Sequence, residues 1–267
     1  MQHISQSNQW RNTAKVLDWF ERIPQKEKCK FIQLDIVEFY PSITADLLEK
    51  ALDFARSITA IDADTHGIIM HSRKSLLFNS DTIWVKRSNP QFDVTMGAYD
   101  GAEVCEIVGL YLLSMIKEKC KDIDLGLYRD DGLGITRNLS GPQTERLRKD
   151  ITQIFKDAGL KITIECGLQQ VNFLDATLSL AYGKYWPFRK PNDTPLYIHT
   201  GSNHPLTIIK ELPLIIEKRI SSISCDETEF LKAKDEYASA LKSSGFNHDL
   251  KFSKPPVTTR RRQRNII

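Results

Sequence analysis

The sequence lacks long apolar runs and has few cysteines. No apolar stretch approaches the ~20 residues that a membrane span needs, and the start, MQHISQSNQWRNTAK, lacks the apolar core of a secretory signal. The five cysteines are scattered and include no CxxC pair, so neither a disulfide framework nor a zinc knuckle is predicted. These absences predict an intracellular protein with reduced thiols, without deciding between nucleus and cytoplasm.

Charge of one sign is not in excess either. The 37 Lys and Arg against 34 Asp and Glu give a net charge of +3, which by itself says little about nucleic acid. Residues 254–267 carry five basic side chains and no acid, a basic tail that can meet phosphates, although a solvated chain end has the same composition. With 41% hydrophobic residues, the 267-residue chain is predicted to fold as one large or two small globular domains.

Short apolar runs alternate with helical patterns in the first half of the chain. FIQLDIV predicts a buried strand, which YPSI ends because proline cannot continue a strand ladder. The acids Asp100 and Glu103 flank Gly101 at the start of a mostly apolar helix, where we interpret them as capping residues. In chain order the expected elements are a strand at 31–37, helices at 44–58 and 64–77, a strand at 81–87 that stops at Asn89-Pro90, and the buried helix at 101–120.

A hairpin signal follows this helix. In LGLYRDDGLGIT two apolar arms flank an Asp-Gly, which predicts a hairpin that turns at Asp131-Gly132. GPQTERLRKDITQIFKDAGL has proline in its first turn and Gly159 as terminator, typical of a helix, and KITIE and VNFLDATLSL are predicted to be the next strands. The order βαββαβ predicts an α+β fold, a split sheet with helices on one face.

The composition changes after Tyr182. A proline-interrupted aromatic segment is followed by two helical patterns, the second with an Asp226/Glu229 capping box and Gly245 as its stop. We therefore expect an N-terminal helical segment at 1–30, a sheet domain at 31–181, a smaller helical module at 182–250 and the basic tail at 251–267.

Two acids stand where a metal site can form. A turn needs one carboxylate at most, yet Asp130 stands directly before Asp131, and adjacent like charges are unfavourable unless a cation offsets them. Asp35 is the only acid in FIQLDIV. If the first hairpin arm neighbours that strand, Asp35 and Asp130 converge at one edge of the sheet. Paired carboxylates suit Mg²⁺ and two-metal phosphoryl transfer.

Several segments resemble motifs of reverse transcriptases. DIVEFYPSI, MGAYDGAE and YRDDGLG are similar, in this order, to polymerase motifs A, B and C, and AGLKITI and NFLDATL to the motif D and E regions. KPNDTPLYIHTGSNHP followed by RISSIS resembles the segment after the palm in Penelope-like retroelement reverse transcriptases. The resemblance covers residues 31–225. It implies a palm with an antiparallel βαββαβ sheet, a thumb-like module after it, and an edge or remnant of the fingers before it.

The resemblance also implies individual roles. Asp35 and Asp130 match the metal-binding aspartates, and Asp131 matches the second, usually more dispensable acid of the YxDD box. The implied substrate-binding residues are Ile36, Phe39, Tyr40, Met96 and Gly97. Of these, Ile36 would act through its backbone carbonyl, Tyr40 would lie under the sugar of the incoming nucleotide, and Met96 and Gly97 belong to motif B. The implied primer and template contacts are Phe173 and Leu174 at the primer grip, and Arg189 and Lys190 on phosphates.

The activity that the resemblance implies is RNA-directed DNA polymerisation. The enzyme would use two Mg²⁺ ions, or Mn²⁺ in their place, to extend a DNA or RNA primer with deoxynucleotides on an RNA template. No membrane partner is expected. Thr95-Met96-Gly97 stands where the family has Gln-Gly, so the glutamine contact is not expected. Only 34 residues precede Asp35, fewer than the fingers need, so we expect a fragment that polymerises poorly.

Two alternatives stay open. DIVEFYPSI also resembles the DxxSLYPS motif of B-family DNA-templated polymerases, whose hairpin however normally reads YxDTDS. A palm that binds nucleic acid without polymerising it is the other alternative.

Overall fold

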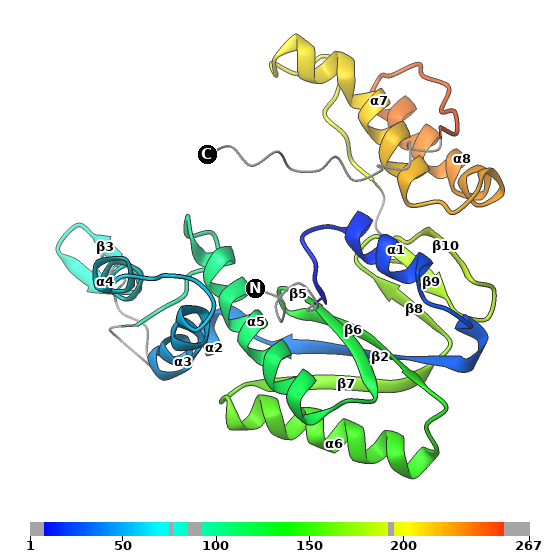
Figure 1. The fold of residues 1–267 in the computed structure, drawn as a ribbon. Coiled ribbons are helices and arrows are strands. Elements are labelled where there is room, and N and C mark those ends of the chain that lie inside the picture. The colour runs from blue at the N-terminus through cyan, green and yellow to red at the C-terminus, as the bar shows by residue number, and fades with distance from the viewer. Residues whose placement is uncertain (1–7, 75–76, 85–91, 192–194, 254–267) are drawn as a thin grey trace, which may run out of the picture. The chain divides into compact units, whose positions relative to one another are not determined.

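The computed structural model describes residues 8–74, 77–84, 92–191 and 195–253, and the chain divides into two compact units (Figure 1). The first unit holds the residues up to Asn12 and Gln25–Val171, and the second holds Thr13–Pro24 and the residues from Asn172 on. The Asn89-Pro90 strand stop and the basic side chains at 254–267 lie outside the described residues.

The first unit is built on a five-stranded sheet in the order β1-β5-β6-β2-β7. β2 is an interior strand, antiparallel to β6 on one side and to β7 on the other, whereas β1 pairs parallel to β5. The predicted strand at 31–37 is confirmed within β2, and the chain leaves it as predicted before Pro41. The strands are β1 Asn8–Gln9, β2 Cys29–Val37, β5 Ile123–Tyr128, β6 Asp131–Arg137 and β7 Lys161–Leu168.

Helices cover one face of this sheet. Ile32, Leu34 and Ile36 alternate along β2 and share one hydrophobic core with buried side chains of α3, α5 and α6. Asp35, between them in sequence, therefore belongs to the other face. The predicted α+β class with helices on one face is confirmed. The helices are α2 Phe39–Ser42, α3 Ala45–Arg56, α4 Ala63–His71, α5 Gly101–Lys119 and α6 Gly141–Asp157.

The helix predicted at 64–77 is too long. α4 ends at His71, because Leu77–Asn79 forms a strand, β3, that pairs with β4 at Thr82–Trp84. The turn residue Ser80 has a φ of 52°, as a tight hairpin requires. Of the strand predicted at 81–87, the part up to Trp84 is confirmed and the rest lies outside the described residues.

The second unit contains α1 and most of a three-stranded sheet in the order β10-β9-β8. The single strand predicted at VNFLDATLSL is wrong, because the chain reverses at Leu174-Asp175, with Leu174 at a φ of 54°. The domain boundary expected after residue 181 falls inside this unit, since β10 pairs with β9. The elements are α1 Thr13–Glu21, β8 Gln170–Phe173, β9 Ala176–Ser179 and β10 Lys184–Pro187.

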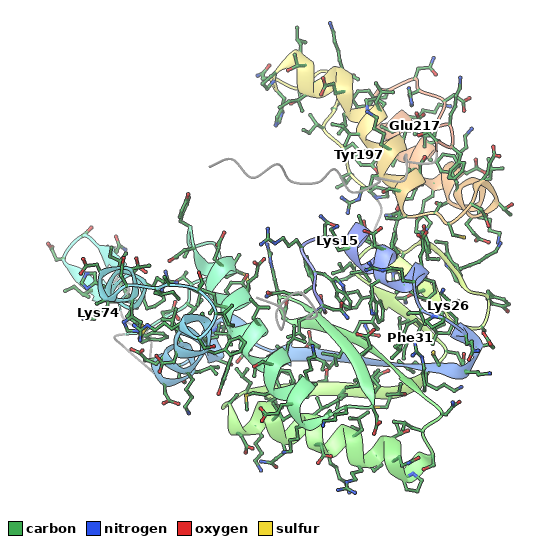
Figure 2. The ribbon with its side chains drawn as sticks, in the orientation of Figure 1. Lys15, Lys26, Phe31, Lys74, Tyr197 and Glu217 are labelled. Atoms are coloured by element: carbon green, nitrogen blue, oxygen red, sulfur yellow. The ribbon has the colours of Figure 1, made fainter. Side chains whose placement is uncertain are left out.

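Two helices complete the second unit, α7 Leu206–Ser222 and α8 Glu227–Ser243. Asp226 caps α8 by accepting from the Glu229 N–H at 3.0 Å, as predicted. Gly245, just after α8, has a φ of 84° and stops the helix, also as predicted. The Glu229 carboxylate bonds to Lys232 rather than completing the predicted capping box. Glu217 on α7 accepts from the Lys251 N–H at 2.8 Å and so holds the segment after α8 (Figure 2).

No described helix is long and apolar enough to cross a membrane.

Candidate active site

The hairpin that carries the adjacent acids turns two residues earlier than predicted. Its two loop residues are Arg129 and Asp130, with Arg129 at a φ of 54°, and Asp131 already opens β6 opposite Tyr128. Gly132 lies inside the strand. A Cβ there would come within 2.6 Å of Leu34 Cγ and 2.9 Å of Leu127 Cδ2. The glycine is therefore required by strand packing, not by the turn.

The hairpin also meets β2 through its second arm, not through the first as expected. Asp35 on β2 lies directly opposite Asp131 on β6. Directly opposed residues of an antiparallel pair point to the same face, with Cβ atoms about 4.5–5.5 Å apart. The pairing extends one step beyond the ladder, because the Ile36 N–H of β2 donates to the carbonyl of the loop residue Asp130 at 2.9 Å. The sheet thus gathers all three predicted acids at one end of two neighbouring strands.

These acids are accessible to solvent. Asp35 is exposed, and Asp130 and Asp131 are half-buried. Within the described residues, the carboxylates of Asp35 and Asp130 have no hydrogen bond or ion pair. Nor does any group of three Asp, Glu, His or Cys side chains in the described ranges form a metal-binding set. A Mg²⁺ ion here would need further oxygen ligands, which substrate phosphates can supply.

An aromatic and a thiol adjoin the acid-bearing turn. Phe39 and Tyr40 on α2 are buried and contact edge to face, and Tyr40 retains 8% exposure. The Tyr40 hydroxyl lies beside the Cys105 thiol of α5, and the two groups influence each other's pKa. Burial raises the pKa of Tyr40 and raises that of Cys105 to about 12, and the negative charge of Asp130 acts in the same direction on both. Ile36, the residue after Asp35, is fully buried.

The segment expected to form motif B lies on the surface before α5. Met96 is 76% exposed, and Gly97 has a φ of 91°, a conformation that favours glycine. Nothing lies within 4 Å of a Cβ built on Gly97, so the backbone there is open to a ligand.

An ion pair missed by the sequence anchors this segment. Arg73, only 2% exposed, donates from its guanidinium to the carboxylate of Asp100, and its carbonyl accepts from the Asp93 N–H at 2.8 Å. Burial works against ionisation of Asp100, but Arg73 outweighs it and holds the pKa of that carboxyl below its usual range. Asp100 occupies the N-cap position of α5 and Glu103 lies in its first turn, as predicted, but the Asp100 side chain makes no cap hydrogen bond. Nothing in the local sequence pattern pairs Arg73 with Asp100.

The residues predicted to contact primer or template fall in the second unit. Phe173 is buried, and Leu174 is a half-exposed residue of the β8–β9 turn. The neighbouring Asp175 is paired with Arg219 of α7 at 2.7 Å. Arg189 forms an ion pair with a glutamate of α8, whereas Lys190 is exposed. All four predicted contact residues belong to the second unit, whereas the three acids belong to the first.

No protein-family model matches the chain, and no curated protein matches its sequence. Solved polymerase structures are similar to it in fold. Telomerase from Candida albicans, in complex with a fragment of telomeric RNA, aligns with a TM-score of 0.56 at 12% identity over 91% of this chain and 43% of that one. The RNA-dependent RNA polymerase of a human picobirnavirus gives 0.53 at 11% identity over 91% and 51%.

The BmCPV RNA-dependent RNA polymerase at its elongation state aligns with a TM-score of 0.51 at 14% identity, over 88% of this chain and 22% of that one. The chain therefore spans about half or less of the length of these polymerases. At such identities the likeness establishes the fold alone. The chain has the palm-type α+β fold of nucleic-acid polymerases.

Proposed function

We propose that this chain carries the catalytic acids of an RNA-directed DNA polymerase of a retroelement similar to the Penelope-like group. Its partners would be an RNA template, a DNA or RNA primer and deoxynucleoside triphosphates. The observation that carries the proposal is the Asp35–Asp131 strand pair, with Asp130 bonded to Ile36 beside it, on a polymerase-type sheet. A fold alone fits many activities, so the acids are what select this one.

The three acids fit Mg²⁺, and Mn²⁺ can substitute. Their carboxylate oxygens are the hard ligands that Mg²⁺ prefers, and the absence of a side-chain partner for Asp35 and Asp130 within the described residues leaves those charges to be offset by a cation. When bound, such ions supply charge stabilisation for the attacking primer 3′-oxygen and the pyrophosphate leaving group. Holding these ions is the role we assign to Asp35, Asp130 and Asp131.

Neighbouring residues would position the incoming nucleotide. Tyr40, with Phe39 packed against it, would lie under the sugar and exclude a 2′-hydroxyl. Gly97, with an open backbone, lets template and nucleotide approach the segment around Met96. The Ile36 carbonyl would be a minor metal ligand. Alignment of the reacting groups by such contacts is a large part of phosphoryl-transfer catalysis.

Primer extension tests the proposal. Asp35→Asn and Asp130→Asn should each abolish extension of a primer on an RNA template while duplex binding stays nearly unchanged, and Asp131→Asn should do less harm. Asp122→Asn makes the same charge change at an exposed turn and should leave extension unchanged. Full activity in Asp35→Asn would rule out the assignment. Extension on DNA but not on RNA templates would instead favour a DNA-templated polymerase.

One observation favours a second function, a palm that binds nucleic acid without polymerising it. Over the described residues no group of three metal-ligand side chains is arranged to hold an ion by itself. Duplex binding without extension in Mg²⁺ or Mn²⁺, by this chain and by every longer form of it, would support this alternative.

A further inference from the structure

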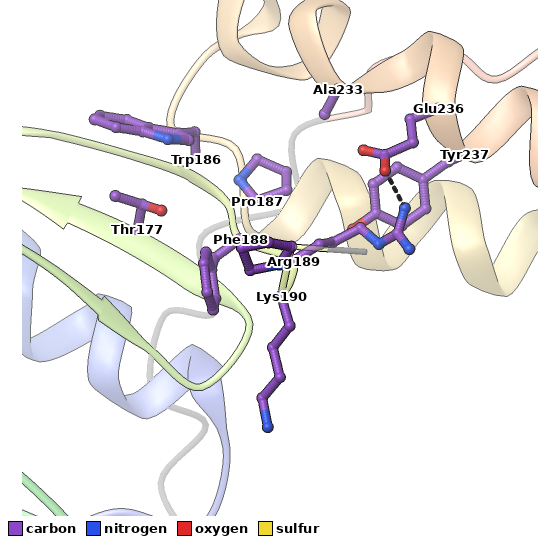
Figure 3. Close-up of a pocket in the computed structure, with 10 residues that line it drawn as sticks. Thr177, Trp186, Pro187, Phe188, Arg189, Lys190, Ala233, Glu236 and Tyr237 are labelled. Atoms are coloured by element: carbon purple, nitrogen blue, oxygen red, sulfur yellow. Dashed lines mark hydrogen bonds and ion pairs between the residues drawn. The ribbon is translucent and has the colours of Figure 1, made fainter. Parts of the chain in front are cut away.

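A recess in the second unit combines aromatic and charged side chains (Figure 3). It lies where the β9–β10 pair meets α8, and Trp186 of β10 is paired with Thr177 of β9. Its volume is about 380 Å³, within the usual range of about 300–1,000 Å³ for small-molecule sites. Its walls include Trp186, Phe188, Arg189, Lys190, Glu236 and Tyr237.

A hydrogen-bond donor in the wall has no partner. Arg189 forms an ion pair with Glu236, and its guanidinium lies 5.7 Å from the centre of the Tyr237 ring. Its Nη2 atom is nevertheless buried without a hydrogen-bond partner in the described structure. A buried donor of this kind is unfavourable until an acceptor reaches it. The recess therefore offers an exposed acceptor, Glu236, which the buried Arg189 guanidinium holds in place.

The charged side chains of the recess favour a ligand with a neutral group inside the recess and an anionic group at its rim. Glu236 in the wall disfavours a phosphate deep in the recess. Lys190 is exposed and points away from the Arg189–Glu236 pair (Figure 3). A nucleotide has both parts, because its flat base carries donors and acceptors on its edge and its phosphate is anionic. Aromatic walls bind bases by stacking regardless of sequence.

We propose that this recess binds one unpaired nucleotide of an RNA or DNA strand. The base stacks on the aromatic wall that includes Trp186, its edge donates to the exposed carboxylate of Glu236, and the adjoining phosphate lies near Lys190. This inference deepens the proposed function by giving the second unit a contact with single-stranded nucleic acid. The binding needs neither metal nor catalysis.

The test is binding of fluorescent single-stranded 12-mers of RNA and of DNA to the 267-residue chain, measured by anisotropy in EDTA. Trp186→Leu should weaken binding about tenfold, as expected for one lost base stack, and Trp186→Phe should restore most of it. Lys190→Gln should weaken binding and reduce the salt dependence by about one phosphate contact. Lys210→Gln, the same change at an exposed α7 residue outside the recess, should have less than a twofold effect.

Wild-type affinity in Trp186→Leu, or equal losses in Lys190→Gln and Lys210→Gln, would overturn the proposal. So would an equal loss for a duplex, or competition by uridine monophosphate as strong as by the 12-mer. Crosslinks from 5-iodouracil in the 12-mer should map to the recess, and crosslinks elsewhere only would also overturn it. Extension activity is a separate readout, because Asp35→Asn should leave this binding intact even as it removes polymerisation.

Discussion

Gly132→Ala tests whether close strand packing holds the acid-bearing hairpin against β2. The added methyl would lie 2.6 Å from Leu34 Cγ and 2.9 Å from Leu127 Cδ2, well inside van der Waals contact. Leu34 is 2% exposed and Leu127 is fully buried, so neither side chain has free space to move into. We therefore expect an overpacking cost of about 1–3 kcal/mol in the free energy of unfolding. The melting temperature should fall by roughly 2–4 °C per kcal/mol.

Gly67→Ala is the matched control. Gly67 lies inside α4, and nothing lies within 4 Å of a Cβ built there. The same change should therefore stabilise the protein by about 0.5–1 kcal/mol, because alanine loses less backbone entropy in a helix. Urea unfolding followed by circular dichroism measures both variants.

The signs of the two changes in unfolding free energy decide whether strand packing is what requires glycine at position 132. If Gly132→Ala is neutral or stabilising, strand packing at this position is not what requires glycine. Leu34→Ala combined with Gly132→Ala should cost less than the sum of the single changes, since it removes the clashing atoms. Strict additivity would contradict the close contact.

Three further predictions follow from the same unit. Tyr40→Ala should raise ribonucleotide relative to deoxynucleotide incorporation in primer extension, and an unchanged ratio in an active enzyme would reject the sugar contact. Burial raises the pKa of Cys105 from its ordinary 9.0 to about 12, so the folded state holds a proton that the unfolded state releases. Its stabilising contribution is thus complete below pH 9 and is lost as the pH rises toward 12. Other thiols and tyrosines have raised pKa values too, so Cys105→Ala should reduce this alkaline loss of stability in urea unfolding without removing it, and an unchanged loss would contradict the prediction. Asp100→Ala should destabilise the protein by about 3 kcal/mol because it leaves the buried Arg73 charge unpaired, and an effect under about 0.5 kcal/mol in urea unfolding would contradict that.

Local chemistry in the sequence was enough for the well-punctuated elements. The α5 helix was predictable from its mostly apolar composition, and α6 from its apolar periodicity, the proline in its first turn and Gly159 after it, because these signals act within a few residues. The β2 strand and the existence of the YRDD hairpin were predictable for the same reason. The three acids were singled out by their place at the ends of apolar runs.

Long-range pairing was beyond local signals. The Asp-Gly step favours a turn by itself, but Gly132 is held in the strand by packing against Leu34, nearly a hundred residues earlier in the chain. For the same reason the sequence did not indicate that β6, rather than β5, would lie beside β2 and so place Asp131 opposite Asp35.

The tertiary structure alone decided which charged groups are paired. Arg73 has no distinguishing feature in the sequence, yet folding buries it and joins it to Asp100, because a buried guanidinium needs an anionic partner. Arg189 was expected to be free for phosphates, and folding pairs it with Glu236 and leaves one of its nitrogens buried without a partner. The sequence by itself thus determined which residues could carry the chemistry. The fold decided which of them meet, because contacts across strands and between helices depend on packing over the whole chain.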